Sequence, residues 1–173
     1  MTIALASSLP VTLLLLLLSL GSVVNAGPGE VIFGQSAPFS GGLWEPGPAF
    51  NLGLLSAFHE ANSKGGVNGR IVKLISLDDK YNATKTAINT AELLKNPDVF
   101  ALVGTMGTVT TLAAMQLTVP AGIPIIGPFS GSSAFRDPFQ ETIINIRASY
   151  TDESLAWVRL LIREKQYKRV SMI

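Results

Sequence analysis

The sequence contains no cysteine, a single histidine and few charged residues, and each shortage excludes a class of function. Without cysteine there is no disulfide framework, no thiolate metal site, no cysteine nucleophile and no lipidated N-terminal cysteine. His59 has no second histidine or cysteine with which to bind a metal, so we interpret it as a surface or boundary residue. Lys and Arg number 13 against 12 Asp and Glu, and a net charge of +1 gives no electrostatic basis for binding nucleic acid or an anionic membrane.

The sequence also lacks the motifs of common enzymes. No G-x-S-x-G turn is present, and His59 is the only imidazole that could serve a serine nucleophile. GTMGTV, residues 104–109, lacks the spacing of a dinucleotide-binding loop, and no Gly-Lys-Ser/Thr follows any loop. Asp78 and Asp79 are neighbours on a strand, so they point to opposite faces and we expect them to bond neighbouring loops. We therefore predict a protein that is not an enzyme and that uses no metal or cofactor.

Long hydrophobic runs are confined to the N-terminus. Residues 11–20 (VTLLLLLLSL) lead to a small-residue cleavage signal at residues 24–26. This pattern indicates a secretory signal peptide over residues 1–26, although its first residues include no Lys or Arg. The apolar stretch is shorter than the roughly 20 residues of a membrane span and is broken by a proline and a glycine. We expect a secreted or periplasmic protein of one domain; the alternative is a retained anchor, with the protein facing outside.

The rest of the chain alternates between short apolar runs and helical patterns. Strands are predicted at residues 31–35, 70–77, 100–103, 123–126 and 143–146, with a further strand beginning at 168. Helices are predicted at residues 49–64, 85–95 and about 108–117, and from residue 151 onward. Strands that are apolar throughout and separated by helices are typical of an α/β fold, a parallel sheet with helices on both faces.

Two of these helices have a predicted buried face. In the helix at residues 85–95 the inward residues are expected to be Ala87, Ile88, Ala91 and Leu94. In the final helix Thr151 is expected to be the N-terminal cap. The buried residues of that helix are expected to be Leu155, Val158, Leu161 and Ile162.

The tetrapeptide Pro-Phe-Ser-Gly occurs twice, at residues 38–41 and 128–131, each time directly after a predicted strand. The loop GTMGT, residues 104–108, follows another strand. In an open parallel sheet the loops after the strands share one rim, where ligands bind. Glycine lets the backbone approach a ligand, and hydroxyls with the free amides of a following helix suit a carboxylate. The alternative is that both tetrapeptides are only turns.

Six segments in order carry a resemblance to a known family: GQSAPFSGG, HEANSKGGVNGR, LISLDDKYNATKT, ALVGTMGTVTT, IPIIGPFSGSSAFRDP and NIRASYTDE. Over residues 31–173 the sequence resembles the type I periplasmic binding proteins, in particular the leucine/isoleucine/valine-binding branch of ABC-transporter substrate-binding proteins. That family has two α/β lobes joined by three crossover strands and closes on amino acids or similar ligands. The resemblance implies a first lobe over residues 27–146, and a crossover with the start of a truncated second lobe over residues 147–173.

The resemblance assigns six residues to ligand binding. They are Thr108, Phe129, Ser130, Gly131, Trp44 and Tyr81. Thr108 matches the hydroxyl that holds the ligand carboxylate, with helix capping as its alternative role, and Trp44 lines the cleft or packs within its loop. The amino-acid binders have an alanine near the place of Phe129, so its larger ring is expected to change the size of the pocket.

Three functions remain open from the sequence. The first is a solute-binding module for an amino acid or similar small carboxylate, working with an ABC permease. The second is the extracellular ligand-sensing region of a membrane receptor that has a signalling domain. The third is a truncated fragment that binds nothing. A chain ending in an incomplete second lobe is expected to self-associate through exposed sheet edges and the apolar face of its last helix.

Overall fold

The computed structural model describes residues 29–42 and 45–171. The predicted signal peptide, residues 1–26, and the candidate ligand residue Trp44 lie outside these residues. Within the described part of the chain, no helix combines the length and the apolar character that crossing a membrane requires.

The fold is built on a sheet of five parallel strands in the order β2-β1-β3-β4-β5. The strands are β1 (Glu30–Ala37), β2 (Ile71–Asp78), β3 (Val99–Val103), β4 (Ile125–Ile126) and β5 (Ile143–Ile144). The predicted α/β class is therefore confirmed, and each predicted strand from residue 31 to residue 146 has an observed counterpart.

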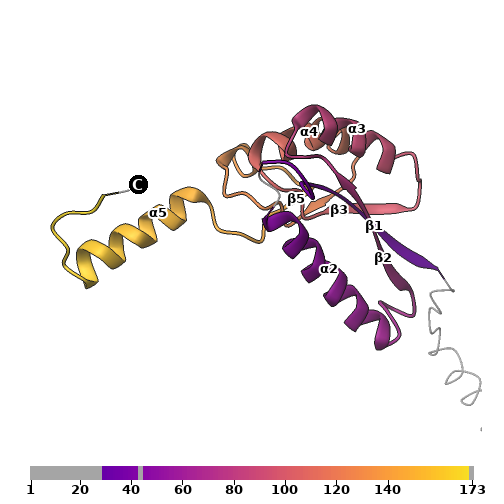
Figure 1. Cartoon of the computed structure of the whole chain (residues 1–173), viewed down its shortest axis with the longest axis horizontal. Coiled ribbons are helices and arrows are strands. Elements are labelled where there is room, and N and C mark those ends of the chain that lie inside the picture. The colour runs from indigo at the N-terminus through magenta and orange to yellow at the C-terminus, as the bar shows by residue number, and fades with distance from the viewer. Residues whose placement is uncertain (1–28, 43–44, 172–173) are drawn as a thin grey trace, which may run out of the picture.

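Helices lie on both faces of this sheet (Figure 1). One face is covered by α2 (Pro46–Ser63), and the opposite face by α3 (Ala83–Leu93) and α4 (Thr108–Thr118). The last helix, α5 (Tyr150–Val158), continues as a π-helical segment, Arg159–Glu164, and extends away from the sheet.

The two faces of the sheet are covered to different extents. The main apolar core lies between the sheet and α3 with α4. Its buried members are Leu93, Val99, Leu102, Ala114, Met115, Ile125, Phe135 and Ile143. On the α2 face Phe33 contacts Phe58 and Phe100, with ring centres 5.3 and 5.7 Å apart. Phe100 nevertheless remains 58% exposed and Ile146 77% exposed, so α2 covers only part of its face.

The predicted inward face of α3 is wrong by one position. The structure buries Thr86, Thr90 and Leu93, whereas Ile88 is 64% exposed. Thr86 faces inward because its hydroxyl donates a 3.0 Å hydrogen bond to the carboxylate of Asp79, which lies seven residues earlier and directly after β2. A threonine whose hydroxyl is satisfied in this way is stable inside the fold, and a search for apolar residues alone does not find it.

The N-terminal cap of α5 is Ser149, and the prediction of Thr151 is wrong. The Ser149 hydroxyl accepts a hydrogen bond from the Asp152 amide at 3.0 Å. The Asp152 carboxylate accepts in return from the Ser149 amide at 3.3 Å. This reciprocal pair is a capping box, which satisfies two amides that the helix leaves free.

The C-terminal segment does not pack as the sequence predicts. No residue of α5 or of the π-helical segment is buried, because both extend away from the sheet (Figure 1). The expected buried face, Leu155, Val158, Leu161 and Ile162, is therefore half-exposed or exposed. Residues 168–171 are irregular, so the strand predicted to begin at residue 168 is not formed there.

Candidate ligand-binding site

The first Pro-Phe-Ser-Gly loop is hydrogen-bonded to the end of β2. The Ser40 hydroxyl donates to one carboxylate oxygen of Asp78 at 2.5 Å, and the Phe39 and Lys80 amides donate to the other at 2.9 and 3.0 Å. Partial burial alone would raise the pKa of Asp78, but these hydrogen bonds outweigh it and lower the pKa below its ordinary value. The Asp78 carboxylate thus joins the loops that follow β1 and β2.

Asp79 has a similar structural role on the other side of the strand. Its fully buried carboxylate accepts from the hydroxyls of Ser36 and Thr86, both at 3.0 Å, and from the Tyr81 amide at 2.9 Å. Burial raises the pKa of Asp79 by more than these hydrogen bonds lower it. The predicted structural hydrogen bonding is therefore observed for both aspartates, but only Asp78 bonds a neighbouring loop, whereas the side-chain partners of Asp79 lie in β1 and α3.

The Tyr81 side chain connects the loop after β2 to the loop after β3. Tyr81 has a left-handed backbone, with φ of 59°, and its amide is held by Asp79. Its ring lies against Gly107, where a Cβ atom would be 2.3 Å from Cε2 and 2.7 Å from the hydroxyl oxygen. Gly107 occupies the N-cap position of α4 with φ of 92° and ψ of 159°, a conformation that is essentially restricted to glycine. Tyr81 therefore lies at the N-terminus of α4.

The second Pro-Phe-Ser-Gly loop pairs with the loop GTMGT. The Phe129 amide donates to the Thr105 carbonyl at 2.7 Å, and the Gly107 amide donates to the Phe129 carbonyl at 3.3 Å. One residue further along each loop, the hydroxyl oxygens of Thr108 and Ser130 lie 2.9 Å apart. Thr108 is the first residue of α4 and not its cap, so its predicted alternative role as an N-cap is wrong.

Tyr150, which is not among the predicted site residues, joins the same group of hydroxyls. Its hydroxyl oxygen lies 3.4 Å from that of Ser130, and its amide donates to the Gly131 carbonyl at 2.8 Å. The Ser130 hydroxyl lowers the pKa of Tyr150, and the positive charge of Arg147 acts in the same direction. We call Thr108, Ser130 and Tyr150 the hydroxyl cluster.

The hydroxyl cluster is suited to a negatively charged oxygen ligand. Hydroxyls can donate to a carboxylate, and the first amides of α4 have no partner within the helix. The positive end of the helix dipole favours an anion at the same place. Ser130 is fully buried and Thr108 half-buried, so Thr108 is the more accessible hydroxyl of this pair. In the described part of the chain no group of three or more acidic, histidine or cysteine residues could hold a metal ion.

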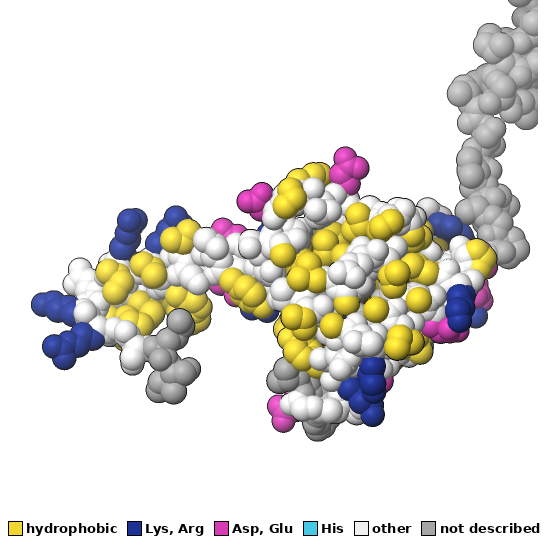
Figure 2. Space-filling model, turned by 90° about the horizontal axis from the view of Figure 1, so that it is seen from above, with side chains coloured by type: hydrophobic (Ala, Val, Ile, Leu, Met, Phe, Trp, Pro, Cys, Tyr) yellow, Lys and Arg dark blue, Asp and Glu magenta, His cyan; other side chains and the backbone are white. Residues whose placement is uncertain are grey.

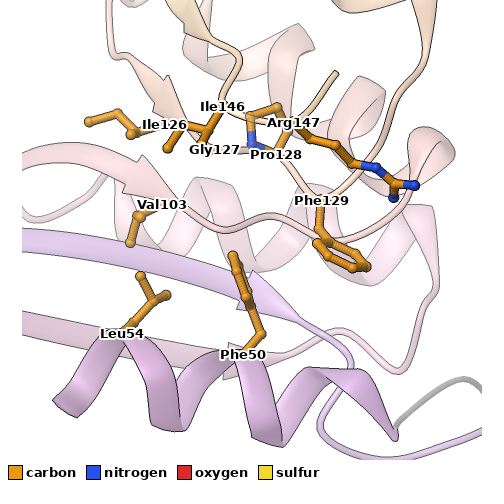
Figure 3. Close-up of a pocket in the computed structure, with 9 residues that line it drawn as sticks. All are labelled: Phe50, Leu54, Val103, Ile126, Gly127, Pro128, Phe129, Ile146 and Arg147. Atoms are coloured by element: carbon orange, nitrogen blue, oxygen red, sulfur yellow. The ribbon is translucent and has the colours of Figure 1, made fainter. Parts of the chain in front are cut away.

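The Phe129 ring points away from this rim. It packs 5.6 Å from the ring of Phe50 on α2 and remains 42% exposed (Figure 3). Together with Leu54, Val103 and Ile126 the two rings line an apolar groove of about 300 Å³ on the α2 face (Figure 3). Phe129 therefore contributes its backbone to the rim and its ring to the groove.

Five of the six residues predicted for the site are described, and all five lie along one rim. The Tyr81 ring lies against Gly107, the hydroxyls of Thr108 and Ser130 are hydrogen-bonded, and the Gly131 carbonyl accepts a hydrogen bond from the Tyr150 amide. The missed residue, Tyr150, carries a hydroxyl after a strand, as Thr108 and Ser130 do, but it is not among the residues that the resemblance assigned.

Comparison with known proteins identifies the family. The family described as periplasmic binding protein matches residues 30–173. This chain belongs to that family. Members of the family are solute-binding proteins and not enzymes, which agrees with the prediction from the sequence.

Relatives in the family support the predicted branch. A Leu/Ile/Val-binding protein homolog from Brucella abortus is 35% identical over 105 residues, which cover 60% of this chain and 25% of the relative. An amino acid binding protein from Pseudomonas aeruginosa is 28% identical over 101 residues, or 58% of this chain and 27% of the relative. The chain thus spans about a quarter of the length of these curated relatives.

Solved structures of other family members share the fold. A possible leucine/isoleucine/valine-binding protein from Rhodopirellula baltica superimposes with a TM-score of 0.73 at 37% identity, over 83% of this chain and 38% of the other. A branched-chain amino acid transporter substrate-binding protein from Streptococcus pneumoniae, solved with isoleucine, has a TM-score of 0.70 at 23% identity, over 79% of this chain and 39% of the other. The predicted type I periplasmic binding protein fold is confirmed.

Proposed function

We propose that this chain provides one lobe of a secreted or periplasmic amino-acid-binding protein, in which the hydroxyl cluster holds the ligand carboxylate. The observation that carries the proposal is the 2.9 Å contact between Thr108 and Ser130 at the N-terminus of α4, with Tyr150 beside it. These side chains come from three segments, separated by 22 and 20 residues. Local turn formation does not require such a convergence of hydroxyls.

Each part of the rim has a definite role in this proposal. Thr108 donates its hydroxyl to the carboxylate, and the following amides of α4 add donors with a favourable dipole. Ser130 is fully buried and sets the position of the Thr108 side chain through their mutual hydrogen bond. Tyr81 and Gly131 form the walls on either side of the anion.

Branched-chain amino acids are the first ligands to test, because the Brucella and Rhodopirellula relatives are named for leucine, isoleucine and valine. We propose that residues 29–146 form the first lobe and that residues 147–171 lead into a second lobe. Domain closure around a ligand supplies contacts from both sides. A single lobe is therefore expected to bind weakly, with Kd on the order of 1 mM, equivalent to roughly 4 kcal/mol. The partner in this proposal is an ABC permease.

The proposal can be tested by nuclear magnetic resonance on the full chain. Titration with leucine, isoleucine and valine should shift the amide signals of Thr108, Ser130 and Gly131. Leucinamide is the matched control ligand, because it keeps the side chain and ammonium group but has no carboxylate. It should leave those signals in place.

Two variants sharpen this test. Thr108→Val and Ser130→Ala should each weaken binding, by up to about tenfold for a lost hydrogen bond. Ser56→Ala removes an exposed hydroxyl from α2 and should have no effect. The carboxylate site would be refuted if the amide signals of the rim shift with none of the amino acids, or if they shift equally with leucinamide.

A further inference from the structure

Arg147 lies between two segments of the candidate site. Its guanidinium carbon is 5.4 Å from the centre of the Phe129 ring and 5.3 Å from the centre of the Tyr150 ring. Phe129 belongs to the second rim loop and Tyr150 begins α5, so one cation contacts aromatic rings of both (Figure 3 shows Arg147 and Phe129). Contacts of this kind are attractive within about 6 Å of a ring centre.

The orientation of Arg147 is set by Glu153 on α5. Nε and Nη2 of Arg147 donate to the two carboxylate oxygens of Glu153 at 2.8 and 2.9 Å. Such a two-point contact fixes the plane of the guanidinium, which a lysine could not reproduce. The hydrogen bond raises the pKa of Arg147 and lowers that of Glu153, so both groups stay charged at neutral pH.

Arg136 makes a second two-point contact at the same place. Its Nη1 donates to the Ser132 carbonyl at 2.7 Å, and its Nη2 donates to the Arg147 carbonyl at 2.6 Å. Ser132 directly follows the second rim loop, and Arg147 lies in the connection from β5 to α5. A planar guanidinium therefore holds the two backbone segments at a fixed separation.

We propose that Arg136 and Arg147 form a clamp that holds residues 147–150 against the second rim loop and thereby positions the Tyr150 hydroxyl beside Ser130. This inference rests on the proposed function, because the clamp positions a hydroxyl of the carboxylate site. Arg136 and Arg147 are therefore positioning residues for that site. Apart from the clamp, Tyr150 has three contacts with the rim. Its amide donates a hydrogen bond to the Gly131 carbonyl, its ring packs against Gly131, and its hydroxyl lies 3.4 Å from that of Ser130. None of these three contacts fixes the Arg147 backbone, which sets the direction from which α5 leaves the sheet.

The ionisation of Tyr150 provides a direct readout of the clamp. The groups that act on its hydroxyl are Ser130, the charged Arg147 and Glu153, and the Gly131 backbone. A full chain labelled with ¹³C at the tyrosine ring carbons can be titrated with base, and Tyr150→Phe identifies its signal.

The experiment compares three clamp variants with one control. Arg147→Met should raise the pKa of Tyr150 toward its ordinary value of about 10 and weaken leucine binding by up to about tenfold. Arg147→Lys should have a smaller effect, because lysine keeps the positive charge but cannot make the two-point hydrogen bond to Glu153. Arg136→Lys should broaden or shift the Tyr150 signal and weaken leucine binding. Arg163→Met removes an exposed charge from the C-terminal segment and should change neither readout.

The outcomes separate this inference from the proposed function. If leucine does not bind the unmodified chain, the carboxylate site fails while the Tyr150 titration still decides the clamp. An unchanged Tyr150 titration and signal in the folded Arg147→Met and Arg136→Lys variants overturns the clamp, even if leucine binds. If Arg147→Met does not fold, Arg147→Lys and Arg136→Lys give the same decision.

Discussion

Gly107 is a position where one added methyl group should disturb the rim. Its φ of 92° and ψ of 159° are essentially restricted to glycine, and the space for a Cβ is filled by the Tyr81 ring at 2.3 Å. The backbone on either side is held by hydrogen bonds, with the Gly107 amide bonded to Phe129 and the Gly107 carbonyl accepting from Thr111. Gly107→Ala therefore introduces backbone strain and a steric clash together.

The expected cost follows from these two effects. Backbone strain of this kind costs about 1–3 kcal/mol. Displacing a packed tyrosine ring adds about 1 kcal/mol, since most single-residue packing losses are of that order. We expect Gly107→Ala to lower the free energy of unfolding by about 2–4 kcal/mol, a large fraction of the roughly 5–15 kcal/mol of an ordinary domain.

Urea unfolding followed by far-ultraviolet circular dichroism measures this change. With a slope of about 2 kcal/mol per molar urea, the midpoint should fall by about 1–2 M. Gly53→Ala is the matched control, because the added Cβ in α2 would meet no atom within 4 Å beyond its chain neighbours and the backbone of its own helix. It should stabilise the chain by about 0.5–1 kcal/mol, since glycine is unfavourable inside a helix. Combining Gly107→Ala with Tyr81→Ala should remove the clash and leave the backbone strain.

A Gly107→Ala variant that unfolds within about 0.5 kcal/mol of the unmodified chain would refute this reasoning, because surface substitutions without structural consequence fall in that range. It would also remove support for the position of Thr108, which follows Gly107 at the start of α4.

Two further predictions concern pH and association. Hydrogen bonds lower the folded-state pKa of Asp78 below 3.8, so Asp78→Asn should be less stable than the unmodified chain at neutral pH, and the difference should shrink as pH falls through that pKa. Burial raises the folded-state pKa of Asp79 above 3.8, so the unmodified chain should lose stability relative to Asp79→Asn as pH rises through that higher value. The free energy of unfolding in urea, measured at several pH values, tests both assignments; a difference between each variant and the unmodified chain that does not change with pH would contradict them. Figure 2 shows hydrophobic side chains along the C-terminal arm, where Trp157 is 60% and Ile162 47% exposed. The unmodified chain should self-associate at micromolar concentration, and the Trp157→Glu variant should self-associate less. A monomeric unmodified chain in sedimentation velocity would contradict this expectation.

Much of the candidate site was predictable because its signals are local. Apolar runs that end in Gly, Ser and Thr mark the strands and the loops that follow them. A parallel sheet then brings those loops to a single rim whatever their separation in sequence. The 2.9 Å contact between Thr108 and Ser130, 22 residues apart, follows from this geometry.

Other features depended on partners that no local pattern reveals. Thr86 is buried because Asp79 accepts its hydroxyl proton, and the Phe129 ring leaves the rim because Phe50 offers an apolar contact on α2. Tyr150, whose hydroxyl lies beside that of Ser130, also contacts Arg147 and Gly131.

The sequence by itself therefore determined the order of strands and helices, the parallel sheet and the rim on which the hydroxyls meet. Hydrophobic period and turn residues act over a few positions, and the sequence displays them directly. Only the tertiary structure decided which face of α3 is buried, where the Phe129 ring points and how Tyr150 is held. Those outcomes are set by pairwise contacts between side chains of different segments, whose energies depend on distances that exist only after the chain has folded.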